Sequence, residues 1–449
     1  MAEKLILDLT TKLQLAQNPS AQESCSKSIY RIPKNLIDVN SQAYEPKLVS
    51  FGPYHHNSRH LLPMEESKCS ALFQFHRRIA RASKTPNDVL IAMRKVEPRL
   101  IAYYDDLQVE DDDKDCLERG QFCRHGWLKE KDEFLKIMIV DSCFALEIML
   151  ADKRLTAGEQ SEYDSHDPIF GVERMIYVVP DLKRDMLLLE NQLPLLALTT
   201  LAAIDGSGIE DVNSLIRAFY NLSSASPEDQ IMDECFHILD MYRKISTSEG
   251  EYLPSYEQNI QSATNLRNVG VSFCKSKTNS FRDISFNGDI LSLPQLKVDD
   301  TTESLLLNLM AFERLHVTVG NKVTAYVFFM DDLINTVDDI ALLRNEEIIK
   351  CFVGRDENIS KIFNKITKEA ILTGFTDGII GVNSLGFFIL YTSGYRCVPM
   401  GTGTYLWIPV FTDVHQCVPA MGNAGYPIWV PLCTTSGYVL YTLCTSGYL

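Results

Sequence analysis

The chain has 449 residues, 45% of them hydrophobic, and it carries a formal net charge of -16 with a pI near 5.1. This length and apolar content suffice for one large or two medium folded domains, so general disorder is not expected. The acidic balance argues against nucleic acid as a partner, because binding a phosphate backbone requires clustered Lys and Arg.

The first predicted element is an amphipathic helix in residues 1–25. Leu5, Leu9 and Leu13 fall on one helical face before Asn18-Pro19-Ser20 ends the helix. This segment lacks the basic region, apolar run and cleavage site of a signal peptide, so we expect a protein that is not secreted. In a reducing compartment the 12 cysteines, which contain no CxxC pair, would be free thiols.

Residues 26–374 are predicted to form one large, mainly α-helical domain. Residues 25–63 carry several prolines and short apolar runs, which predicts irregular and largely extended chain. Pro63 suits the first turn of a helix over residues 63–79, where Glu65 and Glu66 favour the positive end of the helix dipole. Hydrophobic periodicity predicts further helices at residues 88–103, 131–150, 182–191, 194–204, 212–222, 233–245, 323–335 and 360–372.

One small β-hairpin is predicted inside this helical domain. Ile284 and Phe286 alternate with polar residues up to Asn287-Gly288, a dipeptide typical of tight hairpin turns. Beyond the hairpin, Asp300 and Glu303 resemble a capping box that would begin the next helix.

Residues 375–449 differ from the rest of the chain. Their only formally charged side chains are Asp377, Arg396 and Asp413, and the tetrapeptide TSGY occurs three times. No helical or strand period lasts for more than a few residues, which predicts an irregular, low-complexity tail that is poorly ordered. Its apolar runs are too short or too often broken by Gly, Pro and Asn to predict a membrane-spanning helix.

The stretch SFGPYHHNSRHLLPMEESK, residues 50–68, holds three histidines and two glutamates. His56 and His60 have helical spacing, but the helix start at Pro63 places them in a loop. We expect His55 and His56 to hydrogen-bond backbone groups and to cap the following helix, and we predict neither a metal nor another cofactor.

A second group of candidate residues consists of carboxylates and amides. Carboxylates in apolar surroundings have raised pKa values, as general acids need, so one interpretation is a hydrolase that uses two buried carboxylates. The structural interpretation is that these groups pair with Arg184, Lys183 or Arg267, or satisfy backbone groups at a helix break. The candidate residues, structural or interacting, are His55, His56, Asp141, Glu147, Asp185, Glu190, Asn191 and Gln192.

Common catalytic and nucleotide-binding motifs are absent from the sequence. It contains no P-loop, no dinucleotide-binding glycine motif, no G-x-S-x-G and no H-E-x-x-H. Together with the family resemblance described next, this absence predicts a protein without enzymatic activity whose partner is another protein.

Several motifs, in order along residues 29–372, resemble the plant domain of unknown function 247 family, also called UPF0481-like. They are IYRIPKNLIDVNSQAYEPKLVSFGPYHH, MIVDSCFALE, RDMLLLENQLP, SATNLRNVGVSF, DISFNGDILSLPQL and LLNLMAFER. The resemblance implies an interaction or recognition protein of unknown biochemical activity, and some family members are implicated in self-recognition between pollen and stigma. Members typically attach to a membrane by a C-terminal helix. This sequence departs from the family there, so we expect a cytoplasmic protein or one peripheral to the plasma membrane.

Overall fold

The computed structural model describes residues 27–105, 107, 131–206, 209–222, 235–248, 261–352 and 356–372, and four strands between residues 395 and 431. The chain divides into two compact units, Met1–Ser384 and Leu385–Leu449. The amphipathic helix predicted for residues 1–25 lies outside the described residues.

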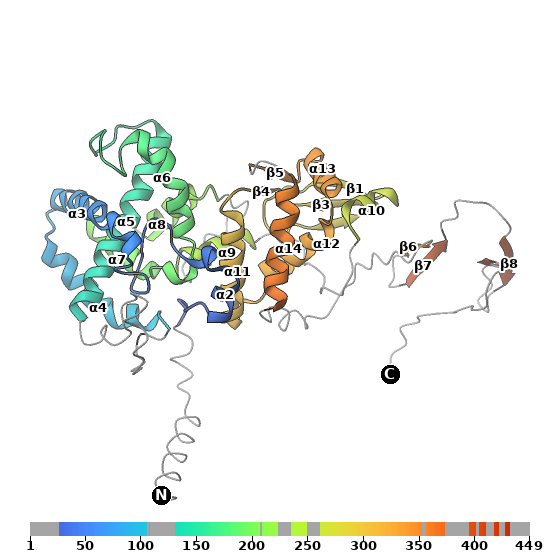
Figure 1. Cartoon of the computed structure of the whole chain (residues 1–449), viewed down its shortest axis with the longest axis horizontal. Helices are drawn as coiled ribbons and strands as arrows, with labels where there is room; N and C mark the ends of the chain where they lie inside the picture. Colours follow the sequence, from blue (N-terminus) through green and yellow to red (C-terminus); the bar gives the residue numbers. More distant parts are fainter. Residues whose placement is uncertain are drawn as a thin grey trace, which may run out of the picture. The chain divides into compact units, whose positions relative to one another are not determined.

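Helix α5 is the centre of the first helical group, as Figure 1 shows. Its sequence is apolar on nearly every side from Phe134 to Met149, so it can be buried all round instead of along one stripe. Helices α3, α4, α6, α7 and α8 all pack on it. The helices of this group are α3 (Pro63–Arg81), α4 (Pro86–Ala102), α5 (Lys131–Ala157), α6 (Val172–Asp185), α7 (Leu195–Asp205) and α8 (Ile209–Phe219).

Helix α11 contacts several of the remaining helices of the first unit. It packs on α2, α9, α12 and α14 and on the short helix η3, and its buried face includes Leu309 and Phe312. The helices of the first unit outside the first helical group are α2 (Lys34–Tyr44), η1 (Arg59–Leu61), η3 (Leu189–Asn191), α9 (Ile238–Ser246), α10 (Ala263–Asn268), α11 (Thr302–Leu315), η5 (Val317–Val319), α12 (Lys322–Leu333), α13 (Val337–Asn345) and α14 (Asp356–Leu372).

Two small sheets accompany these helices. Strands β2 (Ser285–Asn287) and β3 (Ile290–Leu293) form an antiparallel hairpin, and Gly288 in its turn has φ +66. The predicted hairpin is therefore confirmed. Strand β1 (Ser272–Lys275) pairs in parallel with β3, and β4 (Leu296–Val298) pairs in parallel with β5 (Ile349–Cys351). The sequence analysis did not predict these parallel pairs.

The mainly α-helical fold is confirmed, but two element predictions are wrong. Residues 34–44, predicted to be extended, form helix α2 because Leu36, Ala43 and Tyr44 are buried and the helix packs on α11. The predicted helix at residues 182–191 is instead the end of α6, a turn and the short helix η3.

The predicted capping box at Asp300 and Glu303 is also wrong. The Asp299 carboxylate accepts the Thr301 N–H at 2.9 Å and so satisfies a backbone donor at the start of α11. Glu303 accepts from the side chains of Asn40, at 2.6 Å, and Lys365, at 2.5 Å. Its carboxylate therefore joins helices instead of capping one.

The described part of the second unit consists of two antiparallel hairpins, whose strands the sequence analysis did not predict. They are formed by β6 (Tyr395–Met400) with β7 (Thr404–Pro409) and by β8 (Cys417–Met421) with β9 (Pro427–Pro431). Most of residues 375–449 lies outside the described residues, so the poorly ordered tail stays a prediction. Among the helices of the described chain, none is long and apolar enough to cross a membrane.

Removing the residues after Leu372 is expected to leave the melting temperature of the first unit almost unchanged. Of the removed residues, Leu385–Leu449 form a separate compact unit, and α14, which ends at Leu372, is retained. Differential scanning calorimetry of the truncated and full chains checks this expectation. A drop of more than about 4 °C would contradict it. For a small domain such a drop corresponds to a loss of about 1 kcal/mol in the free energy of unfolding, and for a unit of this size to a larger loss.

Candidate functional site

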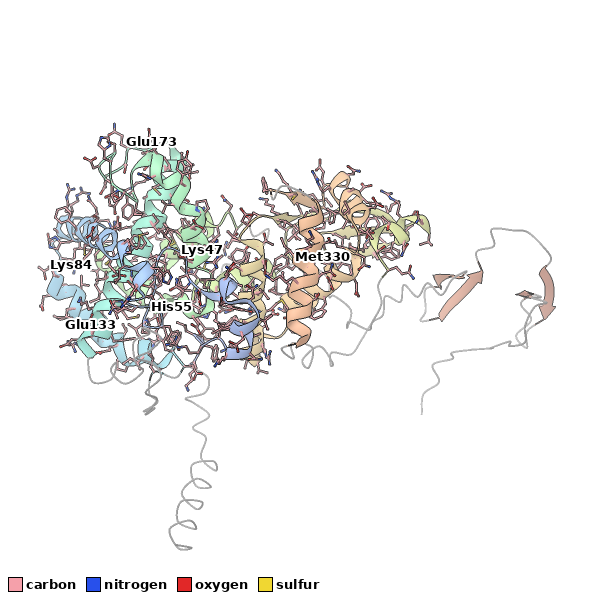
Figure 2. All side chains as sticks on the ribbon, viewed as in Figure 1. Lys47, His55, Lys84, Glu133, Glu173 and Met330 are labelled. Atoms are coloured by element: carbon pink, nitrogen blue, oxygen red, sulfur yellow. The ribbon has the colours of Figure 1, made fainter. Side chains whose placement is uncertain are left out.

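Three of the candidate residues, Asp141, Asp185 and Asn191, converge on the backbone segment of residues 47–52, which lies between α2 and η1. The carboxylate of Asp185, at the end of α6, accepts the N–H groups of Lys47 at 3.0 Å, Leu48 at 2.7 Å and Val49 at 3.0 Å. Figure 2 labels Lys47 in this region. Arg184 pairs with the same carboxylate at 2.8 Å, as the sequence analysis allowed. One buried carboxylate thus satisfies three consecutive backbone donors.

Asn191 and Gln192 continue these contacts from η3. The Asn191 side-chain oxygen accepts the Phe51 N–H at 2.7 Å, and its amide group donates to the Val49 carbonyl at 3.0 Å. The Gln192 side-chain oxygen accepts the Leu239 N–H at 3.1 Å, and its amide group donates to two carbonyl oxygens of the preceding turn. Both side chains are buried and replace backbone partners that neither a helix nor a sheet supplies here.

A fully buried lysine, Lys68 on α3, forms the third part of the site. Its Nζ lies 2.7 Å from Asp141 Oδ1, 2.7 Å from Glu65 Oε1 and 2.7 Å from the Ser50 carbonyl oxygen. Asp141 also accepts the Gly52 N–H at 2.9 Å. Burial raises the pKa of Asp141 to about 6, although Lys68 opposes this. Burial alone would lower the pKa of Lys68, but Asp141 and Glu65 outweigh it and raise that pKa.

Gly52 is required by the geometry of this segment. Its φ is +70, a conformation that L side chains rarely adopt. A Cβ there would lie 2.7 Å from the Tyr104 hydroxyl oxygen and 3.0 Å from the Gln192 carbonyl oxygen. The Tyr104 hydroxyl donates to that same carbonyl at 2.9 Å, so any larger residue would disturb an existing hydrogen bond.

Glu190 contacts the loop that carries the histidines. Its Oε1 accepts the Ile32 N–H at 2.5 Å, and its Oε2 lies 3.3 Å from His55 Nε2 and 3.6 Å from Arg31. Burial alone would raise the pKa of Glu190, but the contacts with His55, Arg31 and the Ile32 N–H outweigh it and lower that pKa.

The prediction that His55 caps the next helix is wrong, because the His55 ring contacts Glu190 instead, whereas the same prediction for His56 stays a prediction. Residue Leu62, at the N-cap position of α3, provides no side-chain hydrogen bond to that helix. Figure 2 labels His55 within the first helical group. Burial lowers the pKa of His56. Within the described residues, no group of three or more His, Cys, Asp and Glu side chains could hold a metal ion.

Glu147 lies in a separate cluster on α5. It pairs with Arg78 of α3 and accepts the Tyr163 hydroxyl at 3.0 Å, while Arg78 also binds Asp205 at 2.7 Å. Burial raises the pKa of Glu147, and Arg78 opposes this. Glu147, Tyr163 and Arg154 are among the residues that line a cavity of about 20 Å³, room for about one water molecule.

The sequence analysis missed the basic partners of Asp141 and Glu147. The predicted candidates Lys183 and Arg267 pair elsewhere, with Asp152 and Glu346. A signal for Lys68 was present, because it occupies the apolar stripe of its helix. The other members of that stripe are Met64, Ala71, Phe75 and Ile79.

A buried histidine outside the predicted set, His237, caps α9. Its Nδ1 accepts the Asp240 N–H at 3.2 Å, and its Nε2 lies 3.0 Å from the Ser28 carbonyl oxygen, which requires an N–H at Nε2. The neutral ring therefore uses both nitrogens. Burial lowers the pKa of His237 from 6.5 to about 4.

Acidification is expected to destabilise the protein through His237. Because its pKa is lower in the folded state, the unfolded chain binds more protons between these two pKa values, and stability falls as the pH drops below 6.5. The loss from this group between pH 7 and pH 5 is about 2 kcal/mol of unfolding free energy.

Urea unfolding at both pH values, on wild type and on His237→Asn, measures this loss. Asn is a good N-cap residue that does not titrate in this range, so the variant is expected to lose about 2 kcal/mol less than wild type between the two pH values. Equal losses in the two proteins would show that His237 is not responsible.

Comparison with known proteins shows the family of the chain. The model of DUF247, described as plant protein of unknown function, matches residues 29–384, and the chain belongs to this family. UPF0481 protein At3g47200 of Arabidopsis thaliana is 27% identical over 400 residues, covering 81% of this chain and 78% of the relative. Putative UPF0481 protein At3g02645 of the same plant is 21% identical over 467 residues, covering 80% and 82%. No solved structure matches the chain.

Proposed function

We propose that this protein is a non-enzymatic interaction protein that binds another protein through the outer face of α6. The observation that carries the proposal is the exposure of Val172, Ile176 and Tyr177, at 44%, 65% and 78%. Exposed apolar and aromatic side chains next to one another are typical of protein interfaces, and Tyr is enriched among the residues that dominate binding.

Val172 and Ile176 lie beside the buried stripe of α6, because residues three or four positions apart share a helix face, whereas Tyr177 lies on the far side of the helix from that stripe. Met175, Val179 and Leu182 are buried, and α6 packs on α5. Helix α6 therefore has exposed apolar side chains beside its buried stripe and, at Tyr177, on its far side. These exposed side chains take no part in the packing of the domain, and a partner provides a reason for them.

The alternative, a hydrolase with two buried carboxylates, has less support from the contacts of its candidate residues. Asp141, Asp185 and Glu190 are at most 6% exposed, and each accepts backbone N–H groups. Glu147 is paired with Arg78 beside a cavity that holds about one water molecule. A general acid must reach the proton-accepting atom of its substrate. These contacts favour a structural role for the four carboxylates.

The place of action that we propose is the cytoplasm or the cytoplasmic face of the plasma membrane. This part of the proposal rests on the family resemblance alone. Self-recognition would be one form of the proposed interaction role. Its support comes from the family resemblance and not from a contact in this structure.

Affinity capture with the full chain tests the proposed surface. Tyr177→Asp places a charge at the most exposed of these three side chains and is expected to abolish capture of the partner from plant extract, because burying an unpaired charge is unfavourable. Val317→Asp is the matched control, since Val317 is an exposed apolar residue on η5 at 82% exposure. Quantitative mass spectrometry that finds the same captured proteins with Tyr177→Asp as with wild type would overturn the proposal.

A further inference from the structure

We infer that the partner at the α6 face is a second copy of this chain. The inference rests on the proposed function, because it names the partner of the same surface. Beside the apolar residues, Glu173 and Arg174 carry opposite charges at successive positions, and both are exposed. Figure 2 shows Glu173 near the start of α6, on the outer side of the helical group.

Neither charge is used inside the molecule. Within the described residues, the Glu173 carboxylate and the Arg174 guanidinium have no ion pair and no side-chain hydrogen bond. Lys183 and Arg184, farther along α6, are paired with Asp152 and Asp185. The α6 face thus carries the unpaired charges of Glu173 and Arg174 next to the exposed side chains of Ile176 and Tyr177, and within the described residues the partly exposed Asp181, one turn after Tyr177, is also unpaired.

This arrangement is complementary to itself. In a dimer with twofold symmetry the same patch is present on both sides, so a contact from residue i to residue j occurs twice. If two α6 helices cross in antiparallel fashion near Glu173 and Arg174, each Glu173 meets the Arg174 of the other copy. Ile176 and Tyr177 then cover the crossing and remove apolar surface from water.

The charge of the whole protein favours this face over others for self-association. The chain carries a net charge of -16, so two copies repel each other over most of their surface. At Glu173 and Arg174 the positive and negative charges cancel locally. Two acidic copies can therefore meet there with little repulsion, and the reciprocal pairs fix their orientation.

Sedimentation velocity over a concentration series, with the full chain, tests the inference. Wild type is expected to form a concentration-dependent dimer. Glu173→Arg and Arg174→Glu each place like charges opposite one another twice, and each is expected to raise the dissociation constant at least about tenfold. The double variant Glu173→Arg/Arg174→Glu restores opposite charges and is expected to return the constant to within about threefold of wild type.

Several outcomes would overturn the inference. These are a wild-type chain that stays monomeric at every concentration, single variants that associate as wild type does, and a double variant that is no better than the single ones. Val317→Asp is again the control and is expected to dimerise normally. A monomeric chain whose captured proteins are lost with Tyr177→Asp would reject the second copy and keep the proposed function. A monomeric chain whose captured proteins are the same with Tyr177→Asp as with wild type would reject both the second copy and the proposed function.

Discussion

Replacing Lys68 with Met is expected to lower the free energy of unfolding by about 3 to 5 kcal/mol, the typical effect of breaking a buried ion pair from one side. Lys68 is fully buried, and its Nζ contacts Asp141, Glu65 and the Ser50 carbonyl oxygen at 2.7 Å each. Met fills a similar volume but leaves the Asp141 carboxylate buried without its cation. Guanidinium chloride unfolding, followed by circular dichroism, measures the loss.

Two further variants show whether the loss comes from the buried charge. In Lys68→Met/Asp141→Asn the side-chain oxygen of residue 141 can still accept the Gly52 N–H, so the double variant is expected to be more stable than Lys68→Met alone. Lys136→Met removes an exposed lysine paired with Glu133 at 3.4 Å and is expected to change stability by less than about 1 kcal/mol. Equal losses in Lys68→Met and Lys136→Met would refute the explanation.

The second large effect is expected for Asp185→Asn, which should lower the free energy of unfolding by about 3 kcal/mol. The carboxylate accepts three backbone N–H groups through its two oxygens and also pairs with Arg184. An amide has one oxygen, and its NH₂ group would face at least one N–H donor. Arg184 would also lose its only carboxylate partner among the described residues.

The matched control for this variant is Asp152→Asn. Asp152 is partly exposed and pairs with Lys183 at 3.6 Å. It is a suitable control because Lys183 directly precedes Arg184, the partner of Asp185, in the sequence. Thermal and urea unfolding are expected to show a change of less than about 1 kcal/mol for this variant. If Asp152→Asn and Asp185→Asn were equally stable, the backbone contacts of Asp185 would have no special role.

Local signals in the sequence predicted local features of the fold. Pro63 with the two glutamates after it predicted the start of α3, and Asn287-Gly288 predicted the hairpin of β2 and β3. The pairing of β4 with β5 could not be predicted in the same way. Each of these strands has three residues, and the partners Leu296 and Ile349 are far apart in the sequence. Helix α2 depends in a similar way on its packing against α11.

The sequence predicted which carboxylates are buried in the site, but not which basic side chains pair with them. Asp141 and Glu147 were recognisable because carboxylates that interrupt an apolar helix are unusual and must be satisfied. Their partners, Lys68 and Arg78, lie on α3, and only the packing of α3 on α5 brings the four side chains together. A sequence pattern shows that a buried charge needs a partner, but it does not show which basic residue the fold places beside it.

The connection at residues 47–52 has a consequence for hydrogen exchange. It is neither helix nor strand, yet most of its N–H groups bond to side chains of Asp185, Asn191 and Asp141, from α6, η3 and α5. Local fraying cannot free these amides, because their acceptors belong to distant helices that must separate first. Amide protons of this loop should therefore exchange about as slowly as those of the most stable helices, and the segment should open only with the whole unit.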